Sequence, residues 1–296
     1  MDRLNIRSNL SVLQSEPYCP KQSMLSKFEG RTDEIRSIFA AWISSASHPP
    51  LSPLLVGLPG VGKNRIVYEL SSITGLNLYI LQGHEDITAE DLACSVRFAD
   101  GAVNGMEYVL SPLVTAMING GICFIDEIGK IRPRALSLLV SVLDERRYID
   151  SSLLGERIVA ADSFRFVAAT NTGEEHDLPE FIRSRMRPVI QVGLPDKKDI
   201  NEIILAQGGV YKNRECLLNQ FWDLCAEQSL NPSARDAIQL FGLAASLGSF
   251  RKAGADSLFE SPDNTKLNET LAGSAVPDIG PEDMEQAFNL FYGAVS

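Results

Sequence analysis

The sequence has few cysteines and histidines, and neither type forms a recognisable cluster. The five cysteines are odd in number and include no Cys-x-x-Cys pair, which argues against a disulfide framework and against a zinc site. The three histidines, His48, His84 and His176, have no partner at the spacing of metal ligands. Unpaired cysteines fit a reducing compartment, so we expect a cytoplasmic protein.

The sequence also lacks a long apolar run and an excess of positive charge. Residues 1–7 contain no apolar signal-peptide segment, and the most apolar later stretch, residues 108–125, is interrupted by proline and glycine. We therefore expect no secretion signal and no membrane span. The formal net charge of −11 and the pI of about 4.8 argue against autonomous binding to nucleic acid or to an anionic membrane.

What is present is the composition of an ordinary globular protein. The chain has 296 residues, of which 45% are hydrophobic and 22% charged. This length is sufficient for one large hydrophobic core together with a smaller companion domain.

The clearest motif is a glycine-rich loop that connects an apolar run, residues 54–56, to a helical pattern from Arg65 to Ile73. In this context the glycines let backbone N–H groups surround phosphate groups, the helix N-terminus faces the anion, and a lysine reaches the outer phosphates. We predict that the following residues hold a nucleotide: Gly57, Pro59, Gly60, Val61, Gly62, Lys63, Asn64 and Arg65.

Asn64 departs from the usual motif, in which the residue after the lysine is Ser or Thr. The hydroxyl that normally ligates Mg²⁺ is therefore absent. Either the amide oxygen of Asn64 takes its place as a ligand, or the magnesium site is weakened. Both alternatives remain open at the level of the sequence.

An acidic pair, Asp126 and Glu127, follows the apolar run of residues 122–125. At the carboxyl end of a buried strand, Asp126 would lie where Mg²⁺ binds and Glu127 where a water can be polarised for attack on a γ-phosphate. A solvated acidic turn is the structural alternative. The phosphate loop about 60 residues upstream favours the functional interpretation.

Asn171 follows another apolar run, residues 164–169. At the end of a strand beside the acidic pair, its amide would orient the attacking water or contact the γ-phosphate. Asparagine at such a position is also a common turn former.

The remaining pattern predicts helices over residues 33–43, 112–119 and 133–146, a hairpin over 148–160 that turns near Gly155, and an inserted loop or hairpin at 97–110. After Pro195 only helical patterns follow. They cover residues 199–206, 216–228, 233–247 and 281–291, with a polar loop at 254–277.

The order of these motifs resembles that of the AAA+ ATPases, and within them the MoxR-like and dynein-related (midasin-type) group. The resemblance covers residues 28–292 and is most specific over 121–195. It implies that Asp126 and Glu127 are the Walker B pair and that Asn171 is the first sensor.

The resemblance also assigns three arginines. It implies that Arg185, with Arg183 in reserve, is a finger that reaches the nucleotide of a neighbouring subunit, and that Arg235 is the second sensor. ATP and Mg²⁺ are the implied cofactors, with Asn64 and Asp126 at the metal.

The implied fold is a three-layer P-loop NTPase core of the α/β class with a parallel sheet, followed by an all-helical lid. We expect an N-terminal extension over residues 1–27, the core over 28–195 and the lid over 196–296. The implied function is ATP hydrolysis by a homo-oligomeric, hexameric ring that remodels a partner, often a protein with a von Willebrand A domain.

Two other functions are compatible with these motifs. Asn64 favours a nucleotide-binding assembly module with little or no hydrolysis, because a weakened metal site removes charge neutralisation from the transition state. The second function is that of a GTP-using or DNA-associated AAA+ subunit. It stays open because the motifs do not show whether the nucleotide is ATP or GTP.

Overall fold

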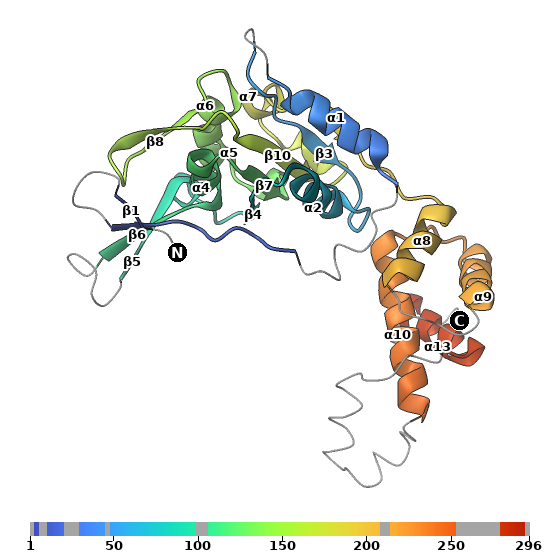
Figure 1. Ribbon diagram of the computed structural model, residues 1–296. Coiled ribbons are helices and arrows are strands. Elements are labelled where there is room, and N and C mark those ends of the chain that lie inside the picture. Colours follow the sequence, from blue (N-terminus) through green and yellow to red (C-terminus); the bar gives the residue numbers. More distant parts are fainter. Residues whose placement is uncertain are drawn as a thin grey trace. The chain divides into compact units, whose positions relative to one another are not determined.

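The computed structural model describes residues 3–5, 11–20, 30–44, 48–98, 106–207, 214–252 and 279–293. The chain divides into two compact units (Figure 1). The first comprises residues 1–25 and 31–193, and the second comprises residues 26–30 and 194–296.

The first unit is built around a five-stranded parallel sheet with the order β11-β3-β10-β7-β4. Strands of such a sheet are buried on both faces and therefore read as continuous apolar runs. The predicted α/β core with a parallel sheet is confirmed. The strands are β3 (Leu54–Val56), β4 (Leu78–Gln82), β7 (Ile122–Asp126), β10 (Arg165–Thr170) and β11 (Val189–Gln191).

The register of the sheet brings the carboxyl ends of its inner strands to one edge. Thr170 of β10 pairs with Val56 of β3, and Gln82 of β4 pairs with Asp126 of β7. The phosphate loop, the acidic pair and Asn171 all follow directly from these ends. Open α/β sheets bind their ligands at this edge.

Helices cover both faces of this sheet. Figure 1 shows α1 (Thr32–Trp42) and α2 (Lys63–Thr74) on one side and α4 (Pro112–Asn119) on the other. Ser111 caps α4 by accepting from the backbone N–H of Val114, and Gly120 ends the helix in a left-handed conformation. The helix predicted at residues 112–119 is thus confirmed.

The predicted continuous helix at residues 133–146 is wrong. The structure has α5 (Pro133–Leu136), a 3₁₀ turn η4 (Ser137–Leu139) and α6 (Val140–Leu143). The chain becomes extended at Asp144, whose carboxylate accepts from the backbone N–H and the guanidinium of Arg146. A local side-chain bond of this kind competes with the helical ladder and ends it.

Short elements complete the first unit. The hairpin of β8 (Tyr148–Ser151) and β9 (Glu156–Val159) turns at Gly155, which has φ 65°, as predicted. The others are α3 (Ala89–Ala93), η3 (Ile128–Lys130), η5 (Glu174–His176) and α7 (Glu180–Arg183).

The insertion predicted at residues 97–110 is part of a second, four-stranded sheet with the order β1-β2-β6-β5. Strands β5 (Cys94–Phe98) and β6 (Met106–Leu110) pair as an antiparallel hairpin whose tip, residues 99–105, lies outside the described residues. The first residues, which show no periodicity, supply β1 (Arg3–Asn5) and β2 (Ser11–Leu13). Strands of three residues are too short to show a period of two.

The described residues of the second unit form four helices, α8 (Lys197–Gln207), α9 (Arg214–Glu227), α10 (Ala234–Lys252) and α13 (Pro281–Tyr292). They pack around buried aromatic side chains, with the rings of Phe221 and Phe241 5.5 Å apart and Phe288 fully buried. These helices agree with the predicted pattern. The predicted loop at 254–277 lies outside the described residues.

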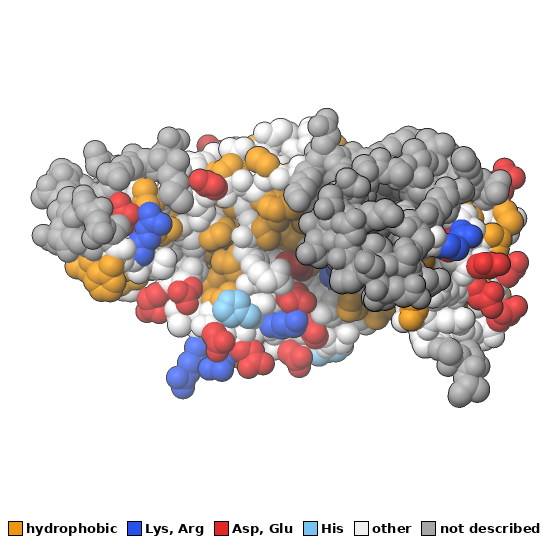
Figure 2. All heavy atoms as spheres, turned by 90° about the horizontal axis from the view of Figure 1, so that it is seen from below, with side chains coloured by type: hydrophobic (Ala, Val, Ile, Leu, Met, Phe, Trp, Pro, Cys, Tyr) orange, Lys and Arg blue, Asp and Glu red, His pale blue; other side chains and the backbone are white. Residues whose placement is uncertain are grey.

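On the face shown in Figure 2, Asp and Glu side chains lie in several groups with Lys and Arg side chains among them. Across the parts of the chain that the structure describes, no helix has both the length and the apolar character needed to cross a membrane.

Replacing Phe124 should test the packing of the central sheet. Phe124 lies in the middle of β7 and is fully buried, so Phe124→Ala should reduce the free energy of unfolding by about 3–5 kcal/mol. Phe98 is 89% exposed, and Phe98→Ala should change it by less than about 0.5 kcal/mol. Urea denaturation of both variants measures the difference, and equal losses would contradict the described burial.

Candidate functional site

The phosphate loop lies between β3 and α2. Gly60 and Gly62 have φ angles of 82° and 100°, a left-handed region that favours glycine. At Gly57, a Cβ atom would collide with the backbone oxygen of Val192. The loop therefore needs glycine at these positions, for its turns and for its close approach to the neighbouring chain.

Lys63 brings two of the predicted site elements together. Its side chain is only 8% exposed, and its Nζ donates to the backbone oxygens of Gly57 at 2.6 Å and Leu58 at 3.1 Å. It also donates to Oδ1 of Asn171 at 3.1 Å. The ammonium group thus joins the loop to the end of β10.

Asn64 and Asp126 are also in direct contact. Nδ2 of Asn64 donates to Oδ2 of Asp126 at 2.9 Å, and Oδ1 of Asp126 accepts from the backbone N–H of Glu127 at 3.0 Å. A carboxylate only accepts, so the amide must turn its nitrogen toward Asp126. The carbonyl oxygen of Asn64 is then the atom that would be left to ligate a metal ion.

Glu127 is held by two side chains that sequence reasoning missed. Its Oε2 accepts from Nε2 of Gln82 at 2.9 Å and lies 2.8 Å from Nζ of Lys130. The hydrogen bond to Glu127 raises the pKa of Lys130. The register gives a signal for Gln82, because it is the last residue of the strand beside β7.

Gly83 allows the chain after β4 to lie close to the backbone of Asp126 and Glu127. Its backbone N–H donates to the backbone oxygen of Asp126 at 2.7 Å. A Cβ atom on Gly83 would collide with the backbone oxygen of Glu127. Glu127 itself has a left-handed φ of 53°, which is costly for a residue with a side chain.

Glu174 orients Asn171 and was also missed. Nδ2 of Asn171 donates to both carboxylate oxygens of Glu174 at 3.2 Å. With its nitrogen held by Glu174, Asn171 presents its oxygen to Lys63.

Tyr68 lies one turn after Asn64 on α2, and the motifs contained no signal for it or for Tyr18, which packs near it. The rings of Tyr18 and Tyr68 lie 5.3 Å apart. Burial, followed by a hydrogen bond with Tyr18, raises the pKa of Tyr68 to about 12, while a hydrogen bond with Asn64 opposes the increase.

The two finger candidates differ in how fully their own chain engages them. Arg183 pairs with Glu180 through two of its nitrogens. Arg185 is 33% exposed, donates to the backbone oxygen of Phe181 at 2.7 Å and places Nε 3.8 Å from Asp144. That buried Nε has no hydrogen-bond acceptor among the described residues.

The other predicted residues lie in several places. Arg65 is on α2, where burial lowers its pKa. Val61 accepts from Arg31 through its backbone oxygen at 3.1 Å, and Pro59 is in the loop. Arg235 belongs to the second unit and is exposed in the first turn of α10.

The donors present fit magnesium. Within the described ranges, no three His, Cys, Asp or Glu side chains come together as a cluster able to hold a metal ion. Mg²⁺ does not need such a cage, since one or two protein oxygens, substrate phosphates and waters commonly complete its shell. Asp126 supplies a carboxylate and Asn64 an amide oxygen, and both are hard ligands.

A family model described as the AAA domain of the dynein-related subfamily matches residues 52–186. Residues 52–186 are a dynein-related AAA domain. The predicted family is thus confirmed. All the predicted site residues except Arg235 lie within this domain.

Two curated relatives are each similar to more than half of the chain. Protein NorQ of Paracoccus denitrificans is 30% identical over 176 residues, which are 59% of this chain and 64% of NorQ. The uncharacterised protein SH1500 of Staphylococcus haemolyticus is 32% identical over 158 residues, which are 52% of this chain and 60% of that protein. The chain thus spans less than two thirds of each relative.

Solved structures support the fold. The AAA domain of FIGL-1 in complex with ADP has a TM-score of 0.57 at 20% identity, covering 92% of this chain and 84% of that one. A Thermotoga maritima RuvB mutant has a TM-score of 0.56 at 16% identity, covering 91% and 73%. Identities this low show the fold alone, and the predicted P-loop NTPase core with a helical region after it is confirmed.

Replacing Gly83 should test the close approach beneath the acidic pair. Gly83→Ala should reduce the free energy of unfolding by about 1–3 kcal/mol, because the added methyl group must displace the backbone of Glu127. Gly193 belongs to the same unit and has open space around its Cβ position. Gly193→Ala should therefore be nearly neutral. Chemical denaturation compares the two, and similar values would show that the approach is not tight.

Proposed function

We propose that this protein binds and hydrolyses ATP as an AAA+ ring and uses the cycle to remodel or activate a partner protein. The observation that supports this most directly is the joining of three separate motifs by side-chain contacts. Lys63 contacts Asn171, and Asn64 contacts Asp126. A fold that only required a stable sheet would not need these polar groups at one edge.

The phosphates of ATP would be bound by the backbone N–H groups of the loop and by Lys63. In the structure, Nζ of Lys63 donates hydrogen bonds to Gly57, Leu58 and Asn171. Phosphate oxygens would replace some of these acceptors, so that Asn171 is released as ATP binds. Asn171 is in this way suited to sense the γ-phosphate, with Glu174 keeping its orientation.

Asp126 and Asn64 would hold Mg²⁺, which supplies charge neutralisation to the phosphates when bound. Glu127 would polarise the attacking water. Its Oε2 is occupied by Gln82 and Lys130, so Oε1, or a carboxylate freed from these two partners, would accept the proton.

The complete site would need a second subunit. Arg185 would enter the site of the neighbouring subunit as the finger, which would make hydrolysis depend on assembly. Arg183 is the second candidate, because Glu180 already pairs with it. Arg235 of the second unit would be the second sensor. A homo-hexamer in the cytoplasm is the assembly we propose, and a protein with a von Willebrand A domain is the proposed class of client.

The second candidate is an assembly module that binds nucleotide without turning it over. The contact between Lys130 and Glu127 favours it, because Lys130 occupies a carboxylate oxygen that would otherwise be open to the attacking water. A GTP-using or DNA-associated AAA+ subunit is a further alternative. RuvB, a Holliday junction branch migration motor, is similar to this chain in fold at 16% identity.

Steady-state phosphate release with Mg²⁺ should separate hydrolysis from binding alone. We expect the assembled wild type to hydrolyse ATP, and Glu127→Gln to reduce the rate by about a hundredfold or more through loss of the base. Asn64→Thr should remain active, since either residue supplies an oxygen ligand. If the wild type is as slow as Glu127→Gln while Asn64→Thr gains activity, the assembly module is the correct function. Competition with GTP in the same assay shows whether the site prefers adenine or guanine nucleotides.

The two arginines provide a matched test of the finger. Arg185→Ala should lower kcat by about a thousandfold or more without dissociating the ring, because it removes charge stabilisation in the transition state. Arg183→Ala should have a far smaller effect, since that side chain is paired within its own subunit. Phosphate release and size-exclusion chromatography are measured together. The reverse ranking would assign the finger to Arg183.

A further inference from the structure

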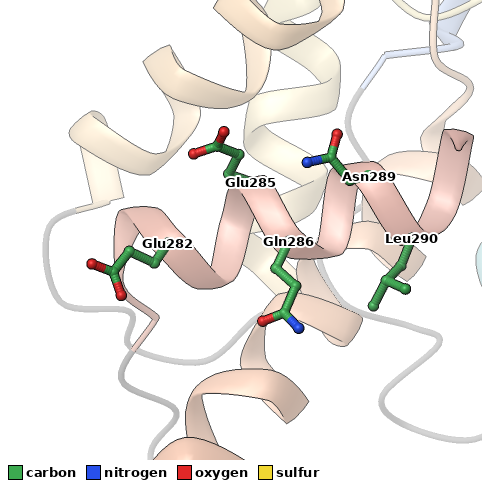
Figure 3. A pocket seen from close by; sticks show the side chains of 5 residues that line it. All are labelled: Glu282, Glu285, Gln286, Asn289 and Leu290. Carbon is green, nitrogen blue, oxygen red and sulfur yellow. The ribbon is translucent and has the colours of Figure 1, made fainter. Parts of the chain in front are cut away.

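A shallow hollow on the exposed side of α13 carries no proposal. Figure 3 shows that the side chains lining it come from this one helix. They are Glu282, Glu285, Gln286, Asn289 and Leu290. Among the described residues, no other element contributes a side chain to it, so nothing there indicates a ligand.

The side chain of Arg31 links three separate segments around the phosphate loop. Its Nη1 donates to Oε1 of Glu34, in the first turn of α1, at 3.0 Å. Its Nη2 donates to the backbone oxygen of Val61, in the phosphate loop, at 3.1 Å and to the backbone oxygen of Gly193, after β11, at 2.6 Å. The side chain is only 14% exposed. One guanidinium group thus joins α1, the loop and the end of the sheet.

The position of Arg31 is fixed by its own helix. Arg31 is the residue before α1 and has a left-handed φ of 62°, which is costly for a residue with a side chain. At the other end of α1, the buried Trp42 donates from Nε1 to the backbone oxygen of Phe166 in β10 at 3.0 Å. The helix is therefore anchored to the sheet, and the guanidinium is held in place without any bound nucleotide.

The part of the loop that Arg31 contacts is not held by packing. At Gly57, the start of the loop, a Cβ atom would collide with the backbone oxygen of Val192. At Gly62 the Cβ position has open space around it, and φ is 100°. Because glycine adopts many backbone conformations, close contacts alone do not fix the peptide group between Val61 and Gly62. Its carbonyl oxygen is fixed by the hydrogen bond from Arg31.

We propose that Arg31 is a positioning residue that holds the Val61–Gly62 peptide group so that the N–H of Gly62 stays available to a nucleotide phosphate. This inference rests on the proposed function. In a planar trans peptide, the carbonyl group and the following N–H point in opposite directions. With the oxygen of Val61 turned to the guanidinium, the N–H of Gly62 points away from it. A rotated peptide would place an oxygen where phosphate binding requires a donor.

The arrangement favours an effect through the loop over a direct attraction between Arg31 and phosphate. The positive charge of Arg31 is opposed by the carboxylate of Glu34 at 3.0 Å, and that side chain is only 17% exposed. Nη2 carries two hydrogens, and both acceptors that it contacts are backbone oxygens. Arg31 is thus occupied by its own chain.

The test is calorimetric binding of ADP and of ATP to the full chain in EDTA, which removes Mg²⁺ and turnover from the measurement. Arg31→Met keeps the length of the side chain and removes its donors. It should raise Kd by about tenfold, the effect of one hydrogen bond from a charged donor. The factor should be the same for both nucleotides, because the loop surrounds the phosphates that they share. Arg31→Lys keeps a charged donor without the planar fork and should raise Kd by only about threefold.

Arg36→Met is the matched control. Arg36 lies on the same helix and pairs with Asp33 at 3.4 Å, but its side chain is 77% exposed, and its loss should leave both affinities unchanged. Glu34→Gln keeps an acceptor for Arg31 and removes the opposing charge. It should change Kd by less than about twofold, since the hydrogen bonds to the loop remain. Urea denaturation of each variant confirms that it is folded.

Wild-type affinity in every folded Arg31 variant would overturn the proposal. So would a loss confined to ATP, which would place Arg31 at the γ-phosphate, or clearly tighter binding in Glu34→Gln, which would show direct attraction by charge. The outcome for the proposed function is separate. If the predicted shifts are found but the wild type releases no phosphate with Mg²⁺, hydrolysis is wrong and the role of Arg31 stands. If the wild type binds neither nucleotide, both are wrong.

Discussion

The buried ammonium group of Lys63 is the interaction on which the site depends. A charge removed from water is costly unless it is surrounded by acceptors, and Lys63 finds three of them within 3.1 Å. Two are carbonyl groups of its own loop, and the third is the amide of Asn171 at the end of a different strand. The need to satisfy one cation therefore determines both the curl of the loop and its distance from β10.

The acidic side chains of the site are satisfied in the same way, by hydrogen-bond donors instead of acceptors. Asp126 is satisfied by donors from Asn64 and from the backbone of Glu127, and Glu127 by donors from Gln82 and Lys130. Each group proposed to act on ATP or Mg²⁺ is thus already in contact with a protein partner. Binding would exchange these partners for phosphate and metal, so the contacts hold the side chains near their working positions beforehand.

The N-terminal segment extends this arrangement beyond the AAA domain. Tyr18 reaches Tyr68 because residues 14–18 are bonded to α4, β6 and β4. The segment thus brings the ring of Tyr18 to 5.3 Å from that of Tyr68 on α2, the helix that follows the phosphate loop.

The sequence by itself identified the site residues whose role follows from the residues next to them in the chain. The glycines, Lys63 and the strand before them form one loop, and the acidic pair directly follows its own strand, so the loop, the parallel sheet and the helical second unit were all predicted. Asn171 was predicted for the same reason, since it ends a strand. The end of the helical segment at Leu143, earlier than the predicted end at residue 146, was not, because the side-chain bonds of Asp144 with Arg146 compete with the helix.

Only the tertiary structure decided which of these groups touch and which other residues join them. Gln82, Lys130, Glu174 and Tyr68 contact site residues because of strand register and short turns, and Tyr18 because of a docked segment far from the loop in sequence. None of them has a motif, since a hydrogen bond between distant residues leaves no local spacing to read. For Asn64, the sequence showed that a hydroxyl was missing. The fold shows what its replacement contacts, because the amide nitrogen of Asn64 donates to Asp126 and the amide oxygen is the atom that would be left for a metal ion.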